Sequence, residues 1–194
     1  EVLDEAKTRF DNNKLEDLPT EIRALIISAN VRHFETPEVI EDLFAAYKNT
    51  PSNDLQNDIA IGLTSTKNPE TAEKILANIK DSNIIRPQDA SRWFVYLIRT
   101  RESRQIAWNW LKENWAWVEG TFGEDKSYDD FIRYAATALL TPNELDDFRQ
   151  FFEPMMDIPA LARTIKLGIT EISARVELIE RDKADVLSAL QTTL

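Results

Sequence analysis

Prolines recur at nearly regular intervals along the first half of the chain. The spacings are 18, 14, 18 and 18 residues, between Pro19, Pro37, Pro51, Pro69 and Pro87. Proline suits the first turn of a helix, because the N–H group that it lacks would have no intrahelical partner there. Helices that begin at such intervals form pairs with a period of about 32 to 36 residues, which is close to the period of two-helix repeat proteins.

Three prolines lie in sequences that are typical of a helix start. "TPE" at 36–38, "NPE" at 68–70 and "TPNE" at 141–144 each place Thr or Asn before the proline and an acidic residue in the first turn. The Thr or Asn side chain accepts a hydrogen bond from a first-turn N–H group, and the acid faces the positive end of the helix dipole. Thr141 and Glu144 also have the spacing of a capping box. We therefore expect a helix to begin at each of these three prolines.

Apolar residues between these starts recur with helical spacing. Two stripes follow helix starts and a third runs through a long C-terminal segment: Val39, Ile40, Leu43, Phe44 and Tyr47; Ala72, Ile75, Leu76 and Ile79; and Leu161, Ile165, Ile169, Ile172, Val176 and Ile179. Only four of the 194 residues are glycine, which disfavours a turn-rich β architecture. The chain is therefore expected to be all-α.

The repeat period favours one architecture within this class. We expect a HEAT/armadillo-like α-solenoid, in which antiparallel helix hairpins stack into a superhelix. An irregular helical bundle is the alternative. No stretch has the composition of a linker, so residues 1–194 are expected to form a single domain.

Four of the five tryptophans fall in "AWNWLKENWAWVEG", residues 107–120. On one helix, with about 100° per residue, two faces are apolar: Ala107, Trp108, Leu111, Trp115 and Val118 on one side, and Ile106, Trp110 and Trp117 on the other. A helix that is apolar on two sides is typical of one buried between neighbours. The tryptophans are therefore expected to belong to the core. There are two alternatives. The tryptophans could form a stacking platform for a sugar or aromatic ligand, or one face of the helix could pack in the core while the other lines a cavity.

Composition argues against several kinds of site. The net charge of −11 opposes nucleic-acid binding, which depends on basic surfaces, and no run approaches the roughly 20 apolar residues of a membrane span. There is no cysteine, and the single histidine, His33, is expected at a helix end in a capping or core role. Gly120 and Gly123 in "EGTFG" indicate a helix C-cap and a turn, not a phosphate loop. We predict no catalytic residue, metal ligand or cofactor site in this chain.

Five of the 13 arginines cluster between residues 86 and 104, in a stretch without lysine. Arg92, Tyr96 and Arg99 share one helix face, with Arg86 and Trp93 nearby. The planar guanidinium group suits carboxylates, so these five residues are the candidate site for the carboxylate tail of a peptide. Ordinary ion pairing with neighbouring acids is the competing interpretation.

Three stretches together resemble a known family: "IRPQDASRW" (85–93), "AWNWLKENWAWVEGTFG" (107–123) and "FFEPMMDIPALARTIKLGITEISARVELIERD" (151–182). In order and spacing they are similar to the C-terminal helical domain of the aminopeptidase N family of zinc metallopeptidases, which includes the puromycin-sensitive and endoplasmic-reticulum aminopeptidases. The resemblance extends over essentially the whole chain.

The resemblance implies a non-catalytic superhelical domain that encloses the substrate cavity of a zinc aminopeptidase and can contact the peptide tail. The "HExxH" zinc site and "GxMEN" strip of the family belong to a catalytic domain expected upstream in the same polypeptide. The missing initiator Met fits a piece of a longer chain. The expected partners are that catalytic domain and peptide substrates, without nucleic acid or membrane, in a bacterial cytoplasm. The alternative is a stand-alone helical-repeat adaptor that binds a partner protein on its concave face.

Overall fold

The computed structural model describes residues 1–124 and 127–193 of the chain. These residues form eleven α-helices and two short 3-10 helices, and no strand occurs among them. The all-α prediction is therefore confirmed. The chain divides into two compact units, Glu1–Trp110 and Leu111–Leu194. The prediction of one domain over residues 1–194 stays a prediction, and each unit is described by itself.

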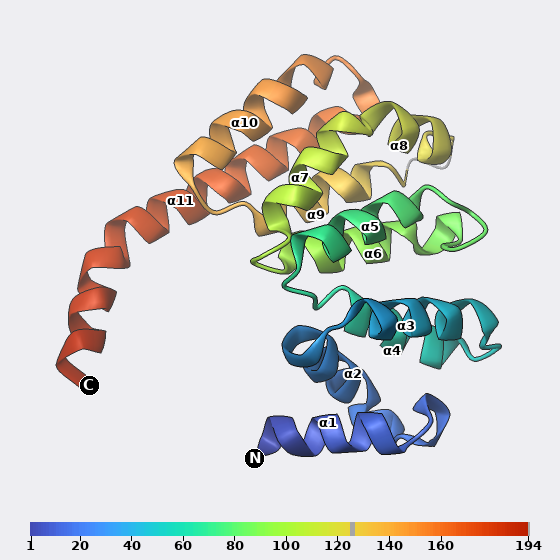
Figure 1. Ribbon diagram of the computed structural model, residues 1–194. Helices are drawn as coiled ribbons and strands as arrows, with labels where there is room; N and C mark the ends of the chain where they lie inside the picture. Colours follow the sequence, from blue (N-terminus) through green and yellow to red (C-terminus); the bar gives the residue numbers. More distant parts are fainter. Residues whose placement is uncertain (125–126, 194) are drawn as a thin grey trace. The chain divides into compact units, whose positions relative to one another are not determined.

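The first unit contains six complete helices and one 3-10 helix: α1 (Val2–Asn12), η1 (Leu15–Asp17), α2 (Thr20–Phe34), α3 (Pro37–Asn49), α4 (Asn53–Leu63), α5 (Pro69–Ile79) and α6 (Pro87–Arg99). Consecutive helices pack on each other in the pairs α1–α2, α3–α4 and α5–α6, and α4 also contacts α2 and α6 (Figure 1). Fully buried residues such as Ile27, Ile59 and Ile75 form its core. Because α4 contacts three other helices, it connects these pairs.

The helix starts predicted from proline and capping residues are confirmed. Helices α3, α5 and α10 (Pro142–Phe152) begin at proline, after Thr36, Asn68 and Thr141, and each of these three side chains accepts a hydrogen bond from a first-turn N–H group. Thr141 and Glu144 form the complete capping box. Pro19 and Pro51 differ from these three in their position relative to the helix start. Pro19 is itself the N-cap of α2, and α4 is capped by Ser52, the residue after Pro51.

Several polar contacts join residues about one predicted period apart. In the first unit, Glu35 accepts hydrogen bonds of 2.5 Å from Thr66 and Thr71, which follow it by 31 and 36 residues. In the second unit, Lys112 donates to Asp147, 35 residues further on, at 2.6 Å. These separations of 31, 36 and 35 residues are close to the predicted period of about 32 to 36 residues. The superhelical stacking of the predicted solenoid stays a prediction.

The tryptophan-rich segment forms two helices where the sequence predicted one. Helix α7 (Arg104–Glu113) and helix α8 (Trp115–Phe122) are separated at Asn114, whose backbone (φ −111°, ψ 17°) is not helical. The predicted buried face is nonetheless confirmed, since Trp108 is fully buried and Trp115 is 7% exposed. The residues of the opposite face are half-buried. Of the two glycines predicted to form a helix C-cap and a turn, Gly123 is the C-cap of α8, whereas Gly120 lies inside that helix.

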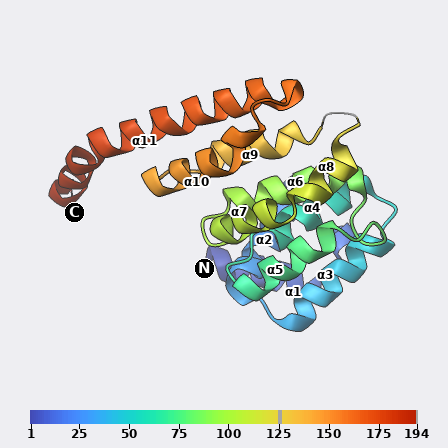
Figure 2. The same cartoon turned by 90° about the horizontal axis from the view of Figure 1, so that it is seen from above.

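The second unit is organised by the long helix α11 (Pro159–Thr193), which packs against α9 (Asp129–Ala138) and α10. Leu161, Ile165 and Ile172 are fully buried, as their spacing predicted. The stripe becomes exposed further along the helix, and Ile179 is already 37% exposed. Figure 2 shows the last turns of α11 extending beyond the ends of α9 and α10. Burial therefore ends where neighbouring helices end, although the apolar spacing continues.

Candidate functional site

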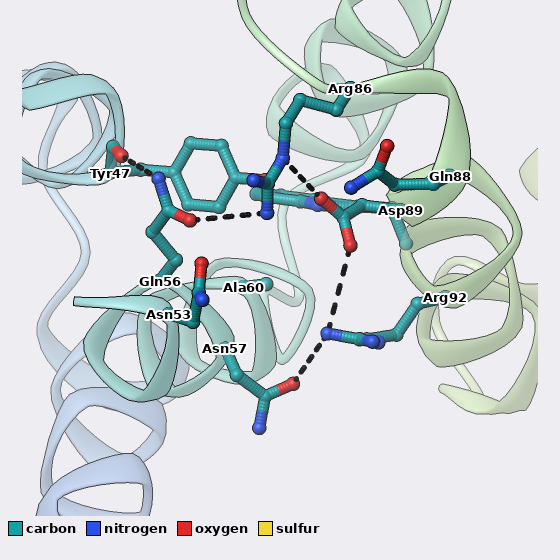
Figure 3. A pocket seen from close by; sticks show the side chains of 10 residues that line it. Tyr47, Asn53, Gln56, Asn57, Ala60, Arg86, Gln88, Asp89 and Arg92 are labelled. Atoms are coloured by element: carbon teal, nitrogen blue, oxygen red, sulfur yellow. Dashed lines mark hydrogen bonds and ion pairs between the residues drawn. The ribbon is translucent and has the colours of Figure 1, made fainter. Parts of the chain in front are cut away.

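A pocket of about 280 Å³ lies in the first unit where the beginning of α6 faces α4 and the end of α3. Figure 3 shows that most of its lining side chains are polar: Tyr47, Asn53, Gln56, Asn57, Ala60, Arg86, Gln88, Asp89, Arg92 and Trp93. Three of the five predicted site residues, Arg86, Arg92 and Trp93, are among them.

Asp89 holds both arginines of the pocket. Its Oδ2 accepts a hydrogen bond of 2.9 Å from Arg86 Nε, and its Oδ1 lies 3.9 Å from Arg92 Nη1. The spacing is i, i+3 on either side, so one helical turn brings each guanidinium group to the same carboxylate. The Asp89 side chain is 11% exposed, whereas those of Arg86 and Arg92 are about half exposed. The carboxylate therefore forms the inner wall and the two arginines form the rim.

The two arginines also bind the amide side chains of α4. Arg86 Nη2 donates to Gln56 Oε1 at 3.4 Å, and Arg92 Nη1 donates to Asn57 Oδ1 at 3.3 Å. Gln56 in turn donates from Nε2 to the Tyr47 carbonyl oxygen at 3.1 Å. Figure 3 shows these contacts as one connected network across the pocket. The network orients both guanidinium groups, which lowers the entropy that binding a ligand would cost.

Two aromatic side chains lie behind the polar network. Trp93 is 1% exposed and packs edge-on against Tyr47, with ring centroids 5.2 Å apart. Burial raises the pKa of the Tyr47 hydroxyl above its usual 10.0, and the negative charge of Asp89 adds to this effect. A hydrogen bond with Trp93 and the charges of Arg86 and Arg92 act in the opposite direction. Trp93 thus belongs mainly to the core and presents little surface to a ligand.

The chemistry of this pocket is that of binding. Two guanidinium groups and one carboxylate leave a formal charge of +1 among these three side chains. Arginine keeps its proton at physiological pH and therefore acts as a donor to carboxylates, not as an acid or base. The arrangement suits an anionic group that sits between the exposed ends of Arg86 and Arg92. Because both arginines already pair with Asp89, the predicted site for a peptide carboxylate stays a prediction.

The pocket does not gather all of the predicted residues. Tyr96 and Arg99 lie on the same helix but do not line this pocket. Asp89 was missed, although its position three residues from each arginine was a local signal for an ion pair. Gln56 and Asn57 had no such signal, because they lie 30 and 35 residues before their arginine partners.

No group of His, Cys, Asp and Glu side chains suited to a metal ion occurs within residues 1–124 and 127–193. His33 lies near the C-terminal end of α2, as predicted, and its side chain is exposed, which excludes the core role. The donor set of the described residues does not fit zinc, which in proteins takes mostly Cys and His ligands. None of the described helices has both the length and the apolar character of a membrane span.

Comparison with known proteins gives a consistent result. The profile of the ERAP1-like C-terminal domain family matches residues 1–174. Aminopeptidase N of Lactococcus lactis subsp. lactis is 33% identical over 91% of this chain. Aminopeptidase N of Lactobacillus helveticus is 31% identical over 93%, and aminopeptidase M1 of Arabidopsis thaliana is 26% identical over 95%. In each case the chain spans 21% of the length of the relative.

Proposed function

The chain belongs to the ERAP1-like C-terminal domain family, and on that premise we propose that it is the non-catalytic C-terminal domain of a zinc aminopeptidase. In this proposal a catalytic domain upstream in the same polypeptide holds zinc and removes N-terminal amino acids from peptides. The helical domain encloses the substrate cavity. The observation that carries the proposal is the family match over residues 1–174, and relatives of about five times this length that are named aminopeptidases support it.

The donor chemistry of the chain supports a non-catalytic role. A catalytic zinc site needs three protein ligands, commonly including two histidines, and this chain contains one histidine and no cysteine. The direct test is to assay the 194-residue chain on aminoacyl-arylamides with added zinc. We expect no turnover above a blank without protein. Turnover that follows the protein through purification and is abolished by a chelator would overturn the proposal.

The gene that encodes the chain tests the alternative of a stand-alone adaptor. We expect its reading frame to continue upstream of Glu1 through a catalytic domain that contains "HExxH". An initiator Met directly before Glu1 would instead support the stand-alone adaptor. A cytoplasmic location is likewise a proposal, which fractionation of the source cells tests by following the protein together with a cytoplasmic marker enzyme.

For the pocket we propose that Arg86 and Arg92 contact the carboxylate at the far end of a peptide. Their exposed guanidinium groups, 49% and 48% exposed as side chains, and the formal charge of +1 support this role. Trp93 supports the position of Tyr47 and of the helix that carries both arginines. The test compares peptides that end in a free carboxylate with the same peptides ending in an amide. Equal affinity for both would overturn this part of the proposal.

A further inference from the structure

A second pocket in the first unit, of about 650 Å³, lies between η1, α2, the end of α3 and the beginning of α4. Leu15, Ala46 and Leu55 provide apolar surface, and Thr50 provides a hydroxyl group. Arg23 of α2 also lines the pocket, although this residue is only 4% exposed. A buried arginine in the wall of a cavity needs an explanation, because an unsatisfied donor in the interior costs about 1 to 3 kcal/mol.

Arg23 is held by one hydrogen bond among the described residues. Its Nε donates to Asp58 Oδ2 at 2.6 Å, and this contact is also its ion pair. A guanidinium group carries five N–H donors, so the two Nη nitrogens keep their donors for another acceptor. Neither Nη atom is among the fully enclosed side-chain atoms without a partner. The pocket that Arg23 lines gives them access to solvent or to a ligand.

The charges around Arg23 indicate which kind of hydrogen-bond acceptor its Nη groups would bind. Asp58, with a side chain that is 15% exposed, neutralises the guanidinium group. Glu16 lines the same pocket and is exposed. The three side chains together have a formal charge of −1, which disfavours an anionic ligand. A carbonyl oxygen accepts hydrogen bonds without bringing a negative charge, so an uncharged amide is the better match.

The apolar residues that line the pocket indicate which kind of group would lie beside the amide. Leu55 is 4% exposed, and Leu15 and Ala46 are half-buried at the pocket. A medium-sized apolar side chain that covers this surface gains about 25 cal/mol per Å² of apolar area removed from water. An amide next to such a side chain is the chemistry of a peptide backbone with a residue such as leucine.

We propose that this pocket binds an uncharged segment of a peptide. A backbone carbonyl oxygen of that segment accepts hydrogen bonds from the Nη groups of Arg23. The neighbouring apolar side chain packs against Leu15, Ala46 and Leu55. Asp58 orients the guanidinium group through Nε and leaves its outer edge for the ligand. The site uses neither Arg86 nor Arg92, and it does not depend on the function proposed above.

The test uses N-acetyl-leucine N-methylamide as the probe and nuclear magnetic resonance titration of the isotope-labelled 194-residue chain. We expect saturable shifts of the Arg23 Nε–H signal and of the backbone signals of Thr50 and Leu55. N-acetyl-leucine, which carries a carboxylate, is expected to bind more weakly because of Asp58 and Glu16. Binding of the carboxylate probe as tightly as the amide would overturn the proposed ligand class.

A matched pair of variants locates the site. Ala46→Leu places a larger side chain on the apolar wall where the probe would pack and leaves Arg23 and Asp58 in place, and we expect it to weaken the binding of the probe about fivefold. Ala45→Leu makes the same change at the neighbouring exposed position of α3, outside the pocket lining, and is expected to bind as the wild type does. Arg23→Lys keeps a cation beside Asp58 but loses the planar pair of donors, and should also weaken binding. Unchanged affinity in both Ala46→Leu and Arg23→Lys would overturn the proposal.

Discussion

Gly62 of α4 lies directly against Ile27 of α2. A Cβ atom built at residue 62 would stand 2.9 Å from Ile27 Cβ and closer still to Cγ2. Both residues belong to the buried surface between these helices, so a side chain at position 62 has no room. The absence of a side chain at this position is what allows α2 and α4 to approach so closely.

Replacing Gly62 with alanine should therefore destabilise the first unit. We expect Gly62→Ala to lower the free energy of unfolding by about 1 to 3 kcal/mol, since overpacking outweighs the better helix propensity of alanine. Gly120→Ala is the matched control, because Gly120 lies inside α8 with nothing within 4 Å of the added Cβ. It should be neutral or stabilising by up to about 1 kcal/mol. Urea denaturation measures both, and equal effects of the two variants would contradict the packing argument.

Asp89→Asn is expected to strengthen the binding of a peptide carboxylate. The substitution keeps the shape of the side chain but removes the charge that Arg86 and Arg92 share. The arginine partners of Asp89 are about half exposed, and ion pairs of exposed arginines contribute about 0.2 to 1 kcal/mol, so we expect an affinity gain of about two- to fivefold at low ionic strength. Fluorescence anisotropy with a labelled peptide measures this change, and added salt should diminish it.

Arg86→Gln and Arg92→Gln should each weaken the binding of the peptide carboxylate. Arg101→Gln removes the same charge from an exposed residue outside the pocket lining and should leave the affinity near that of the wild type. If Arg101→Gln weakens binding as much as Arg92→Gln does, the affinity reflects overall charge and the pocket is not the binding site.

Loss of the capping box should destabilise the second unit. Thr141 Oγ1 accepts from the Glu144 N–H group at 3.3 Å, and Glu144 Oε2 accepts from the Thr141 N–H group at 2.8 Å. We expect Thr141→Ala to cost about 1 kcal/mol. Thr170→Ala, at an exposed interior position of α11, should cost nothing, because alanine is the better helix former. Thermal unfolding followed by circular dichroism compares the two, and a similar loss in both would show that capping is not the cause.

Tyr47 makes the stability of the first unit depend on pH in the alkaline range. Its pKa is raised in the folded protein above 10.0. The unfolded state therefore loses its proton first as the pH rises. The stabilising contribution of the neutral hydroxyl is fully present below about pH 10 and is lost as the pH rises through the folded pKa.

Wild-type protein should therefore lose stability with rising pH more steeply than Tyr47→Phe, which has no hydroxyl group to ionise. Urea unfolding midpoints of both proteins between about pH 9 and 11 measure the difference. Parallel pH profiles for the two proteins would contradict the raised pKa.

Local signals predicted the helix starts because capping acts over one helical turn. Thr36, Asn68 and Thr141 each bind an N–H group within three residues, so the relevant partners are present in the sequence around each proline. The same reasoning failed at Asn114, where one predicted helix is divided into α7 and α8. Both halves have helical apolar spacing, which favours one continuous helix. Asn114 is the N-cap of α8, a position where asparagine is common, but a single asparagine within that spacing does not distinguish a cap from a helix interior.

The candidate site was predictable only in part for a related reason. The i, i+3 relations of Arg86, Asp89 and Arg92 follow from helix geometry alone. Gln56 and Asn57 reach these arginines because α4 packs beside α6 in one particular register. Helix packing is determined by how the ridges of one surface fit the grooves of the other, and this depends on many side chains at once.

The all-α fold, most helix starts and the period of the helix pairs therefore follow from the amino-acid sequence, because they depend on interactions over a few residues or on composition. Which cations are buried depends on helix packing, which brings Arg23 beside Asp58, 35 residues away, at the wall of a pocket. Contacts at such separations exist only after the helices have packed. They are therefore a property of the assembled core and not of any local stretch of the chain.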